Sequence, residues 1–372
     1  MAVRFFRRTG SPDMLLLAAL FLLLVVGLVG LSSASFELGA KQFGDPFAYL
    51  KQQFLHGILP GAVLFLAGFF ISYRLYKKWA PAFFLASLVL VILVFSPLGF
   101  RSGGSGRWLD VGFFSFQPSE LLKITFVLYL AAWLSNVRTE RRSNFATGFV
   151  PFLLISGMAA GLLLLQPATS TVAILLAAGI ALYFLGGGKI RFIAGLAGIG
   201  IVALAMLIFF TGYRFNRVAV HLGVIDDPLG KGYQSAEALT AIGSGQMFGL
   251  GFGQSLAKAR KLPALVSDSI FAVIASEFGF VGSSLIVGLF GFLVVRMLLI
   301  ARKMRDMFGK LTLAGFALII GMQAFVHIGA LSGVLPLTGI PLPFISLGGT
   351  AMVVFLAMMG ISLNISKYAE NS

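Results

Sequence analysis

The chain of 372 residues contains no cysteine, so disulfide bonds, thiolate nucleophiles and cysteine-ligated metal sites are excluded. Its three histidines are scattered, with no HExxH or other metal-ligand spacing: His56, His221 and His327. Charged residues are also scarce, at 11% of the chain, whereas soluble globular proteins carry about 25%. Hydrophobic residues make up 58%. This composition predicts an integral membrane protein.

Acidic residues are fewer than basic ones, with 13 Asp and Glu against 28 Lys and Arg and a formal net charge of +15. In a soluble protein this excess would suggest nucleic-acid binding. Here the basic residues lie in short segments between apolar runs, a pattern typical of membrane-topology signals and of contact with anionic lipid. The sequence has no RNA-binding aromatic motif and no basic domain, so nucleic acid is not an expected partner.

Apolar runs long enough to cross a membrane recur along the whole chain, since a transmembrane helix needs about 20 apolar residues. The first run is longer than the apolar core of a cleaved signal peptide, which favours a transmembrane helix. The sequence predicts ten spans, near residues 14–34, 54–73, 79–99, 118–136, 148–166, 170–187, 190–211, 269–299, 312–332 and 344–366.

The charges between these spans indicate their orientation. The segments "YRLYKK" (73–78), "NVRTERRSN" (136–144) and "RKMRDMFGK" (302–310) are short and basic, which predicts that they and both termini are cytoplasmic. Residues 212–268 are glycine-rich and are predicted to form a long extracytoplasmic loop between spans 7 and 8, partly buried and re-entrant. The predicted fold is an all-α integral membrane protein of about ten helices. It is a single polytopic domain, 1–372.

Ionisable residues inside apolar spans are the first candidates for function. Glu120 and Lys123 lie three residues apart and are predicted to pair on one helix face, either as a structural ion pair or as part of a site. Glu277 has no oppositely charged residue one turn away on its own helix. Its partner is therefore expected on another helix.

Asp268 stands at the outer mouth of span 8, and two interpretations are open. It is either an N-terminal cap that complements the helix dipole, or a carboxylate that acts at a cavity on the membrane surface. A glycosidase-like pair with Glu277 is disfavoured. On one straight helix the two side chains would lie on opposite faces and about 13 Å apart.

Two uncharged segments are also informative. The run "GSGQMFGLGFG" (243–253) follows no predicted strand, which argues against a phosphate-binding loop; its glycines permit tight turns. The run "GVLPLTGIPLPFISLGGTA" (333–351) has three prolines and no charge. It predicts an outer loop that lines a cavity or touches lipid rather than a plain connection. Gly348 and Gly349 are expected to allow close packing in span 10.

Five segments, in order, carry a resemblance to one family: "DPFAYLKQQ" (45–53), "GRWLDVGFFSFQPSELLK" (106–123), "GYQSAEALTAIGSGQMFGLGFGQS" (232–255), "LPALVSDSIFAVIASEFGFVG" (262–282) and "LPLTGIPLPFISLGGTA" (335–351). Over nearly its whole length the chain resembles the SEDS proteins (shape, elongation, division and sporulation), represented by FtsW and RodA. The segments "FGDPFAYLK", "SYRLYKK" and "GYRFNR" look more like FtsW.

The resemblance implies an inverting peptidoglycan glycosyltransferase in the bacterial cytoplasmic membrane. Such a protein polymerises lipid II into glycan strands at the outer face of that membrane, for septal or other cell-wall synthesis. The implied partners are lipid II, the growing strand, a class B penicillin-binding protein and other divisome or elongasome proteins. The essential aspartate of the family falls on Asp268, its RW arginine on Arg107, and its QPSEL.K pair on Glu120 and Lys123.

The chain departs from the family pattern at several positions, which bears on metal binding, cavity polarity and partner dependence. The residues at these positions are Ala168 for Asp, Glu237 for Gln, Ala264 for Glu, Val266 for His or Gln, His327 for Asn and Leu347 for Tyr. Glu237, Glu277 and His327 are expected to be polar contacts that support the structure or line the cavity.

The implied reaction is attack of a GlcNAc hydroxyl on a MurNAc diphosphate, for which Asp268 would accept the proton or orient the hydroxyl. The departing diphosphate needs cations, and arginine suits phosphate contact. The predicted contacts for the diphosphate or its cavity are Arg107, Glu120, Lys123, Arg214, Arg217, Lys258, Arg260, Lys261 and Ser346. A divalent cation, Mg²⁺ or Mn²⁺, is a candidate to share this task, with Asp268 as a ligand. A lipid II flippase and a non-catalytic divisome scaffold remain the alternative functions.

Overall fold

The computed structural model describes residues 10–102, 105–110, 112, 115–136, 144–166, 168–221, 224, 231–259 and 264–369, and in α9 and α10 it describes only part of the side chains. The first half contains α1 (Met14–Phe43), α2 (Ala48–Gln53), the π-helical turn η1 (Phe54–Ile58), α3 (Leu59–Phe70), α4 (Tyr73–Leu93), α5 (Pro118–Asn136), the π-helical turn η2 (Phe145–Phe149), α7 (Val150–Leu165) and α8 (Thr169–Leu185). The second half contains α9 (Ile190–Phe210), α10 (Gly212–His221), α11 (Lys231–Ser244), α12 (Leu256–Ala259), α13 (Ile270–Lys303), α14 (Met307–Leu331) and α15 (Gly349–Ser366).

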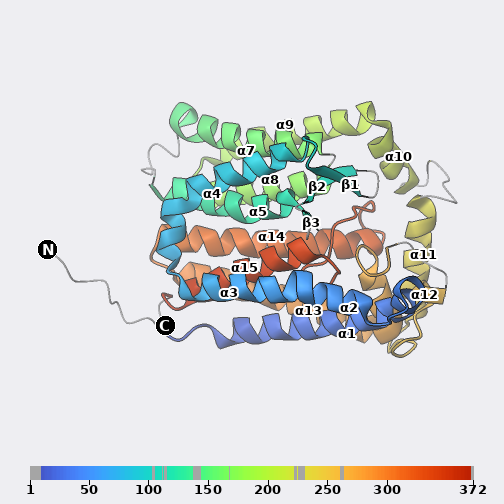
Figure 1. Ribbon diagram of the computed structural model, residues 1–372. Coiled ribbons are helices and arrows are strands. Elements are labelled where there is room, and N and C mark those ends of the chain that lie inside the picture. Colours follow the sequence, from blue (N-terminus) through green and yellow to red (C-terminus); the bar gives the residue numbers. More distant parts are fainter. Residues whose placement is uncertain are drawn as a thin grey trace.

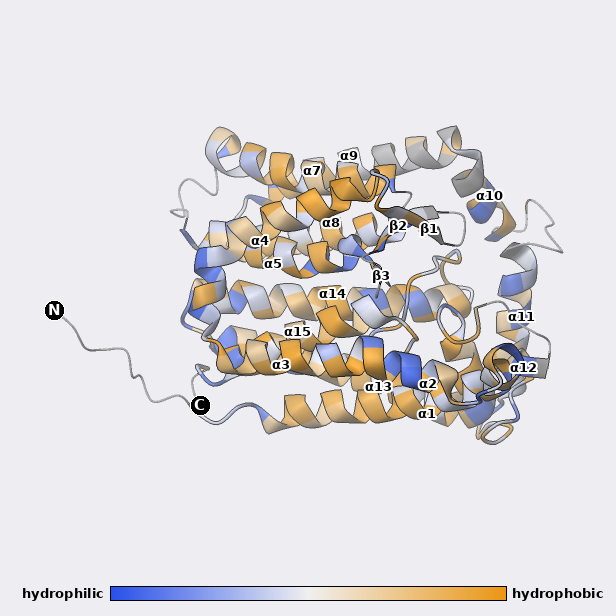
Figure 2. Ribbon diagram, viewed as in Figure 1, coloured by the Kyte–Doolittle hydropathy of each residue, from blue (hydrophilic) through white to orange (hydrophobic). Residues whose placement is uncertain are grey.

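Each apolar run predicted from the sequence overlaps one of these helices, and η1 joins α2 to α3 as a single rod. Among the residues that the structure describes, seven helical rods are long and apolar enough to cross a membrane, and α8 is a shorter apolar helix. Their outward faces carry exposed apolar side chains, such as Phe21 (64% exposed), Val63 (60%) and Leu285 (69%). Figure 2 shows apolar residues along the middle of the rods. The chain is therefore a mostly helical, multi-pass membrane protein.

The two ends of the described chain meet at one end of the helix bundle. The Gly10 amide donates to the Lys367 carbonyl at 2.8 Å, and the Asp13 amide donates to Ser366 Oγ at 3.0 Å. The helices α10, α11 and α12 lie at the opposite end (Figure 1). We call these the terminal end and the loop end. Asp13 also caps α1, because its Oδ1 accepts from the Leu16 amide at 2.9 Å.

A small antiparallel sheet corrects the prediction of an all-α fold. Its strands are β1 (Gly99–Ser102), β2 (Ser105–Asp110) and β3 (Ser115–Phe116), in the order β1-β2-β3. Phe100 pairs with Trp108, and Leu109 with Phe116. Aromatic residues suit such cross-strand positions. The sequence did not predict this ribbon, because its strands are short and pair through cross-strand contacts.

The predicted outer loop is also more ordered than expected, since α10, α11 and α12 lie within it. After α11 the backbone folds back against α13. The amides of Leu250 and Gly251 donate to the carbonyls of Ser276 and Glu277, at 3.0 and 3.1 Å. The Phe280 amide donates to the Gln246 carbonyl at 2.8 Å. These bonds satisfy backbone groups that a break in α13 releases.

The break in α13 is at Gly279, whose φ of 66° and ψ of −163° belong to a region that only glycine adopts readily. A Cβ there would also overlap the Gly249 nitrogen and lie 2.7 Å from the Gly245 carbonyl oxygen. Gly279→Ala is therefore expected to lower the free energy of unfolding by more than the roughly 1–3 kcal/mol of backbone strain alone.

Thermal unfolding of the purified variant in detergent would measure this loss. The control is Gly288→Ala, on the same helix, where a Cβ would meet no atom within 4 Å. Equal unfolding temperatures for the two variants would contradict the assignment of the break to glycine.

Close packing of α3 against α15 orients the segment that precedes α15. A Cβ on Gly68 would lie 2.8 Å from the Ile361 nitrogen, and one on Gly349 would lie 2.8 Å from the His56 carbonyl oxygen. Small residues at helix contacts allow such approach of two backbones. The predicted role of Gly349 in close packing is thereby confirmed.

Candidate functional site

Asp268 lies in a turn, residues 264–269, immediately before α13, and it is partly buried. The capping residue of α13 is Ser269, whose side chain makes no capping hydrogen bond. The cap position therefore does not belong to Asp268, and the interpretation of Asp268 as a helix cap loses its support. The carboxylate lines a pocket instead.

The pocket is formed at the loop end by α11, α14, the turn before α13 and the loop of residues 332–348. Its lining residues are Gln234, Asp268, His327, Ala330, Leu331, Leu337, Thr338, Gly339 and Ile340. Its volume of about 20 Å³ corresponds to roughly one water-sized group. A sugar ring does not fit inside, but a single hydroxyl group does. The prediction that the uncharged loop lines a cavity is confirmed.

Hydrogen bonds from the loop of residues 332–348 hold the turn that carries Asp268. Ser346 Oγ donates to the Ser267 carbonyl at 2.6 Å and accepts from the Leu342 amide at 2.8 Å. The Leu347 amide donates to the Val266 carbonyl at 2.8 Å. Ser346, predicted as a contact in the diphosphate cavity, thus fixes the position of the turn.

Ser346→Ala is expected to lower the free energy of unfolding by about 1–3 kcal/mol, because it leaves a partly buried carbonyl and a buried amide without their partner. Thermal unfolding in detergent would measure the change. Ser332→Ala is the control, since Ser332 follows α14 directly and, among the described residues, its Oγ bonds only to the Ile328 carbonyl one turn earlier. A Ser346→Ala protein as stable as the control would contradict the role of Ser346 in holding the turn of residues 264–269.

At Gly339 the backbone of the loop of residues 332–348 comes close to Asp268. A Cβ on this residue would lie 3.3 Å from Asp268 Oδ2, and its φ of 65° is in the region that favours glycine. Any other residue would crowd the carboxylate and strain the loop. The backbone at position 339 therefore forms one wall of the pocket.

The predicted cations are distributed over several places. Arg217 on α10 donates through Nη1 to the Leu337 carbonyl at 3.1 Å, which places it beside the pocket lining. Arg107 on β2 donates through Nε to the Gln166 carbonyl at 3.0 Å. The side chain of Arg214 and the residues Arg260 and Lys261 lie outside the described part of the chain.

The predicted pair at the start of α5 is a buried ion pair. Lys123 Nζ lies 2.6 Å from Glu120 Oε2, and both side chains are almost fully buried. Lys123 Nζ also donates to Gln323 Oε1 at 2.6 Å, and Gln323 Nε2 donates to the Pro341 carbonyl at 2.9 Å. The pair thus supports the loop of residues 332–348 through Gln323 on α14.

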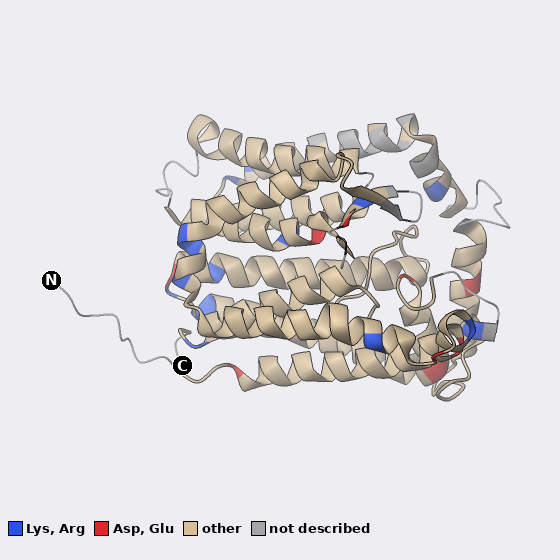
Figure 3. Cartoon of the chain, in the orientation of Figure 1, with Lys and Arg blue, Asp and Glu red and all other residues tan. Residues whose placement is uncertain are grey.

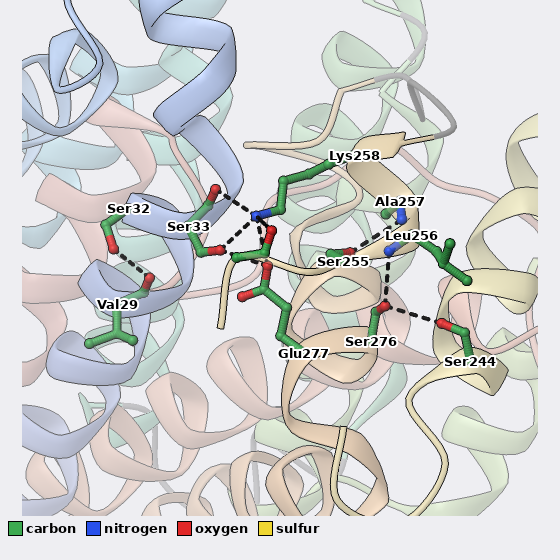
Figure 4. A network of polar contacts seen from close by, with 11 residues as sticks. Val29, Ser32, Ser33, Ser244, Ser255, Leu256, Ala257, Lys258, Ser276 and Glu277 are labelled. Atoms are coloured by element: carbon green, nitrogen blue, oxygen red, sulfur yellow. Dashed lines mark hydrogen bonds and ion pairs between the residues drawn. The ribbon is translucent and has the colours of Figure 1, made fainter. Parts of the chain in front are cut away.

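Glu277 and Lys258 form a second buried cluster, shown in Figure 4. Lys258 Nζ lies 2.8 Å from Glu277 Oε1, and Ser33 Oγ donates to the same oxygen at 2.6 Å. The expectation that Glu277 finds its partners on other helices is confirmed, since Ser33 lies on α1 and Lys258 on α12. The structure places Lys258 in this cluster, away from the lining of the Asp268 pocket.

Three glutamines were missed by the sequence analysis. Gln234 lines the pocket and donates to Ser269 Oγ at 3.3 Å. Gln53 donates to the Ser346 carbonyl at 3.2 Å and accepts from the Gly348 amide at 3.1 Å. Gln323 connects Lys123 to the loop, as described above. A search for buried polar residues of every kind, in addition to charged ones, would have found them.

Glu237 lies on α11, three residues after Gln234, and is partly buried.

The described residues contain no group of three or more His, Asp or Glu that could hold a metal ion. Asp268 is the carboxylate of the pocket. A divalent cation at this place would need the oxygens of a bound diphosphate as further ligands, which is how proteins often hold Mg²⁺. The pocket therefore fits a divalent cation that Asp268 and a bound diphosphate hold together. It does not fit a cation that the described protein residues hold alone.

The fold and the pocket together define a class: a multi-pass membrane protein with one carboxylate at a surface pocket, held by an uncharged loop. The comparisons with known proteins agree. The family model of the FtsW, RodA and SpoVE cell cycle proteins matches residues 13–371. The chain therefore belongs to this family, and its FtsW-named relatives support the FtsW-like character predicted from the sequence.

Two relatives show the extent of the similarity. The probable peptidoglycan glycosyltransferase FtsW of Geobacter sp. (strain M18) is 35% identical over 361 residues, which cover 97% of this chain and 98% of the relative. The stage V sporulation protein E of Bacillus subtilis (strain 168) is 36% identical over 362 residues, covering 97% and 98%.

Solved structures agree with the fold. A chain from a structure described as "structural coordination of polymerization and crosslinking by a peptidoglycan synthase complex" matches with a TM-score of 0.79 and 28% identity, covering 97% of this chain and 99% of that chain. The crystal structure of the Thermus thermophilus rod shape determining protein RodA matches with a TM-score of 0.73 and 26% identity, covering 97% and 99%.

Proposed function

We propose that this chain is an FtsW-like peptidoglycan glycosyltransferase, which joins lipid-linked disaccharides into glycan strands. Two lines of support meet here. Relatives that align over nearly the whole chain are named peptidoglycan glycosyltransferases. The observation in this chain that carries the proposal is the pocket at Asp268, which pairs a carboxylate with room for one hydroxyl group.

The topology of the proposed enzyme follows from its two ends. Basic residues gather at the terminal end, where α4 begins and α13 ends (Figure 3). This distribution supports a cytoplasmic terminal end and an extracytoplasmic loop end in the bacterial inner membrane. All ten predicted helices then cross the membrane as one domain. The Asp268 pocket opens at the outer surface, where lipid II is consumed.

The proposed reaction needs one base and a neutralised leaving group. The 4-hydroxyl of the acceptor GlcNAc enters the pocket and attacks the anomeric carbon of the donor MurNAc with inversion. The new bond to oxygen forms while the bond to the diphosphate breaks, and the diphosphate leaves with the electron pair. Asp268 binds the hydroxyl and assists removal of its proton. Arg217 donates to the carbonyl of Leu337, which lines the pocket, and guanidinium suits bidentate contact with phosphate.

The proposed partners are lipid II, the growing strand and a class B penicillin-binding protein. The complex of the solved relative couples polymerization to crosslinking, which supports a crosslinking partner for this chain as well. A shared divalent cation, Mg²⁺ or Mn²⁺, would lower the charge of the diphosphate when it is bound. Asp268 would be its protein ligand.

The direct test is glycan-strand formation from labelled lipid II by the purified protein in proteoliposomes, with and without the partner transpeptidase. Polymer in either sample supports a glycosyltransferase. No polymer in both samples, together with movement of lipid II across the bilayer, would support a flippase instead. Neither activity, with binding of the partner retained, would support a scaffold.

A further inference from the structure

Gln234 places a buried carboxamide on the helix α11, which packs against α13. Ala238 and Ala241 follow it at helical spacing on the same face and are almost fully buried. Gln234 is itself only 8% exposed. A buried amide is unfavourable unless its donors and its acceptor find partners. The position therefore calls for hydrogen bonds to the protein or to a ligand.

The described protein supplies one partner for this amide. Gln234 Nε2 donates to Ser269 Oγ at 3.3 Å, and Ser269 follows Asp268 directly in the chain. The carbonyl oxygen Oε1 receives no hydrogen bond from a described residue. Because Gln234 lines the pocket of Asp268, this acceptor is available to a ligand that binds there.

The pocket lining thus contains two oxygen acceptors of different charge, the carboxylate of Asp268 and the neutral Oε1 of Gln234. Two acceptors in one small site match a ligand with two neighbouring O–H donors. The acceptor GlcNAc of the proposed reaction has such a pair. Its 3- and 4-hydroxyls are equatorial on adjacent ring carbons, so their oxygens lie close together.

We propose that Gln234 binds the 3-hydroxyl of the acceptor GlcNAc and thereby determines which hydroxyl reacts, an inference that rests on the glycosyltransferase function proposed above. The pocket has room for one hydroxyl group, and the 4-hydroxyl enters it toward Asp268. The sugar ring stays outside, and the 3-hydroxyl donates to Gln234 Oε1 at the entrance.

The difference in charge between the two acceptors explains the selectivity. A carboxylate assists removal of a proton from the hydroxyl that it binds, whereas a neutral amide binds a hydroxyl and leaves its proton in place. The 4-oxygen therefore attacks, and the 3-hydroxyl holds the sugar. MurNAc carries an ether at carbon 3 and has no hydrogen there to donate. Gln234 thus favours GlcNAc over MurNAc as the acceptor.

The test compares kcat/KM for polymerisation of lipid II and of synthetic lipid II whose GlcNAc lacks the 3-hydroxyl. We expect wild type to use the 3-deoxy substrate at least about 10-fold less well, since the analogue leaves a buried acceptor without its donor. Gln234→Met removes the acceptor and keeps the length of the side chain. Gln234→Asn withdraws the amide by one methylene. We expect both variants to use the two substrates about equally.

The ratio of the two kcat/KM values separates substrate binding from a structural role. Both values come from one protein preparation, so the ratio does not depend on the fraction that is folded. A structural role alone would lower both values in the same proportion. Gln254→Met is the matched control, the same substitution at an exposed glutamine outside the pocket lining, and should keep the wild-type ratio.

Two results would overturn the inference. One is a wild type that polymerises the 3-deoxy substrate as well as lipid II. The other is discrimination that persists in Gln234→Met and Gln234→Asn, which would assign the 3-hydroxyl to another group of the lining, such as Thr338. A wild type that does not polymerise lipid II itself would instead overturn the proposed function, and this inference with it.

Discussion

Asp268→Asn is expected to reduce the rate of glycan polymerisation by about 10²–10⁴-fold, the usual contribution of a positioned acid–base group. The substitution keeps the size of the side chain and removes its negative charge. The turn of residues 264–269 is held by backbone and Ser346 contacts that do not involve this side chain. The variant should therefore fold and bind lipid II while failing to polymerise it.

The measurement is strand formation from labelled lipid II in proteoliposomes, with thermal unfolding as the check on folding. Glu37→Gln is the matched control. Glu37 is an exposed carboxylate on α1 whose one ion pair within the described part of the chain is with Lys41, at 3.7 Å. The control should polymerise at the wild-type rate. Polymerisation by a folded Asp268→Asn protein at that same rate would remove Asp268 from the mechanism.

Lys123→Met is expected to lower the free energy of unfolding by about 3–5 kcal/mol, because it leaves the Glu120 carboxylate buried without a counter-charge. It also removes the donor to Gln323, which supports the loop of residues 332–348. The double variant Glu120→Gln with Lys123→Met should recover much of the loss, since replacing both charges of a buried pair is often close to neutral.

Thermal unfolding of the detergent-solubilised variants measures these differences. Lys41→Met, which breaks an exposed pair with Glu37, is expected to change the free energy of unfolding by less than about 1 kcal/mol. If Lys123→Met were as stable as Lys41→Met, the buried pair would not support the loop as described.

The helices were predictable because a membrane span needs a long apolar run, and such runs are visible without knowledge of tertiary contacts. The small sheet was not predictable in this way, since β1, β2 and β3 are short and pair through cross-strand contacts. The break in α13 was also missed. Gly279 lies in a continuous apolar pattern, and only the returning backbone of residues 246–251 shows that the helix is interrupted there.

The charged residues of the site were predictable from the sequence. Asp268 and the Glu120–Lys123 pair stand out in an apolar chain, because a charge in a membrane span is costly and requires a reason. The glutamines Gln53, Gln234 and Gln323 do not stand out, because they carry no charge. Their roles depend on backbone carbonyls and amides brought close by the fold. The residue type alone does not reveal them.

The central claim is that the attacking hydroxyl of the acceptor sugar enters the pocket at Asp268, and a single thiol tests it most directly. The chain has no cysteine, so Thr338→Cys places one unique reactive group in the pocket lining. Gln254→Cys, at an exposed position outside that lining, is the control. The account predicts that lipid II slows maleimide labelling at position 338 but not at 254, and that labelling at 338 stops polymerisation. Labelling at 338 that is unaffected by lipid II and leaves polymerisation intact would contradict it.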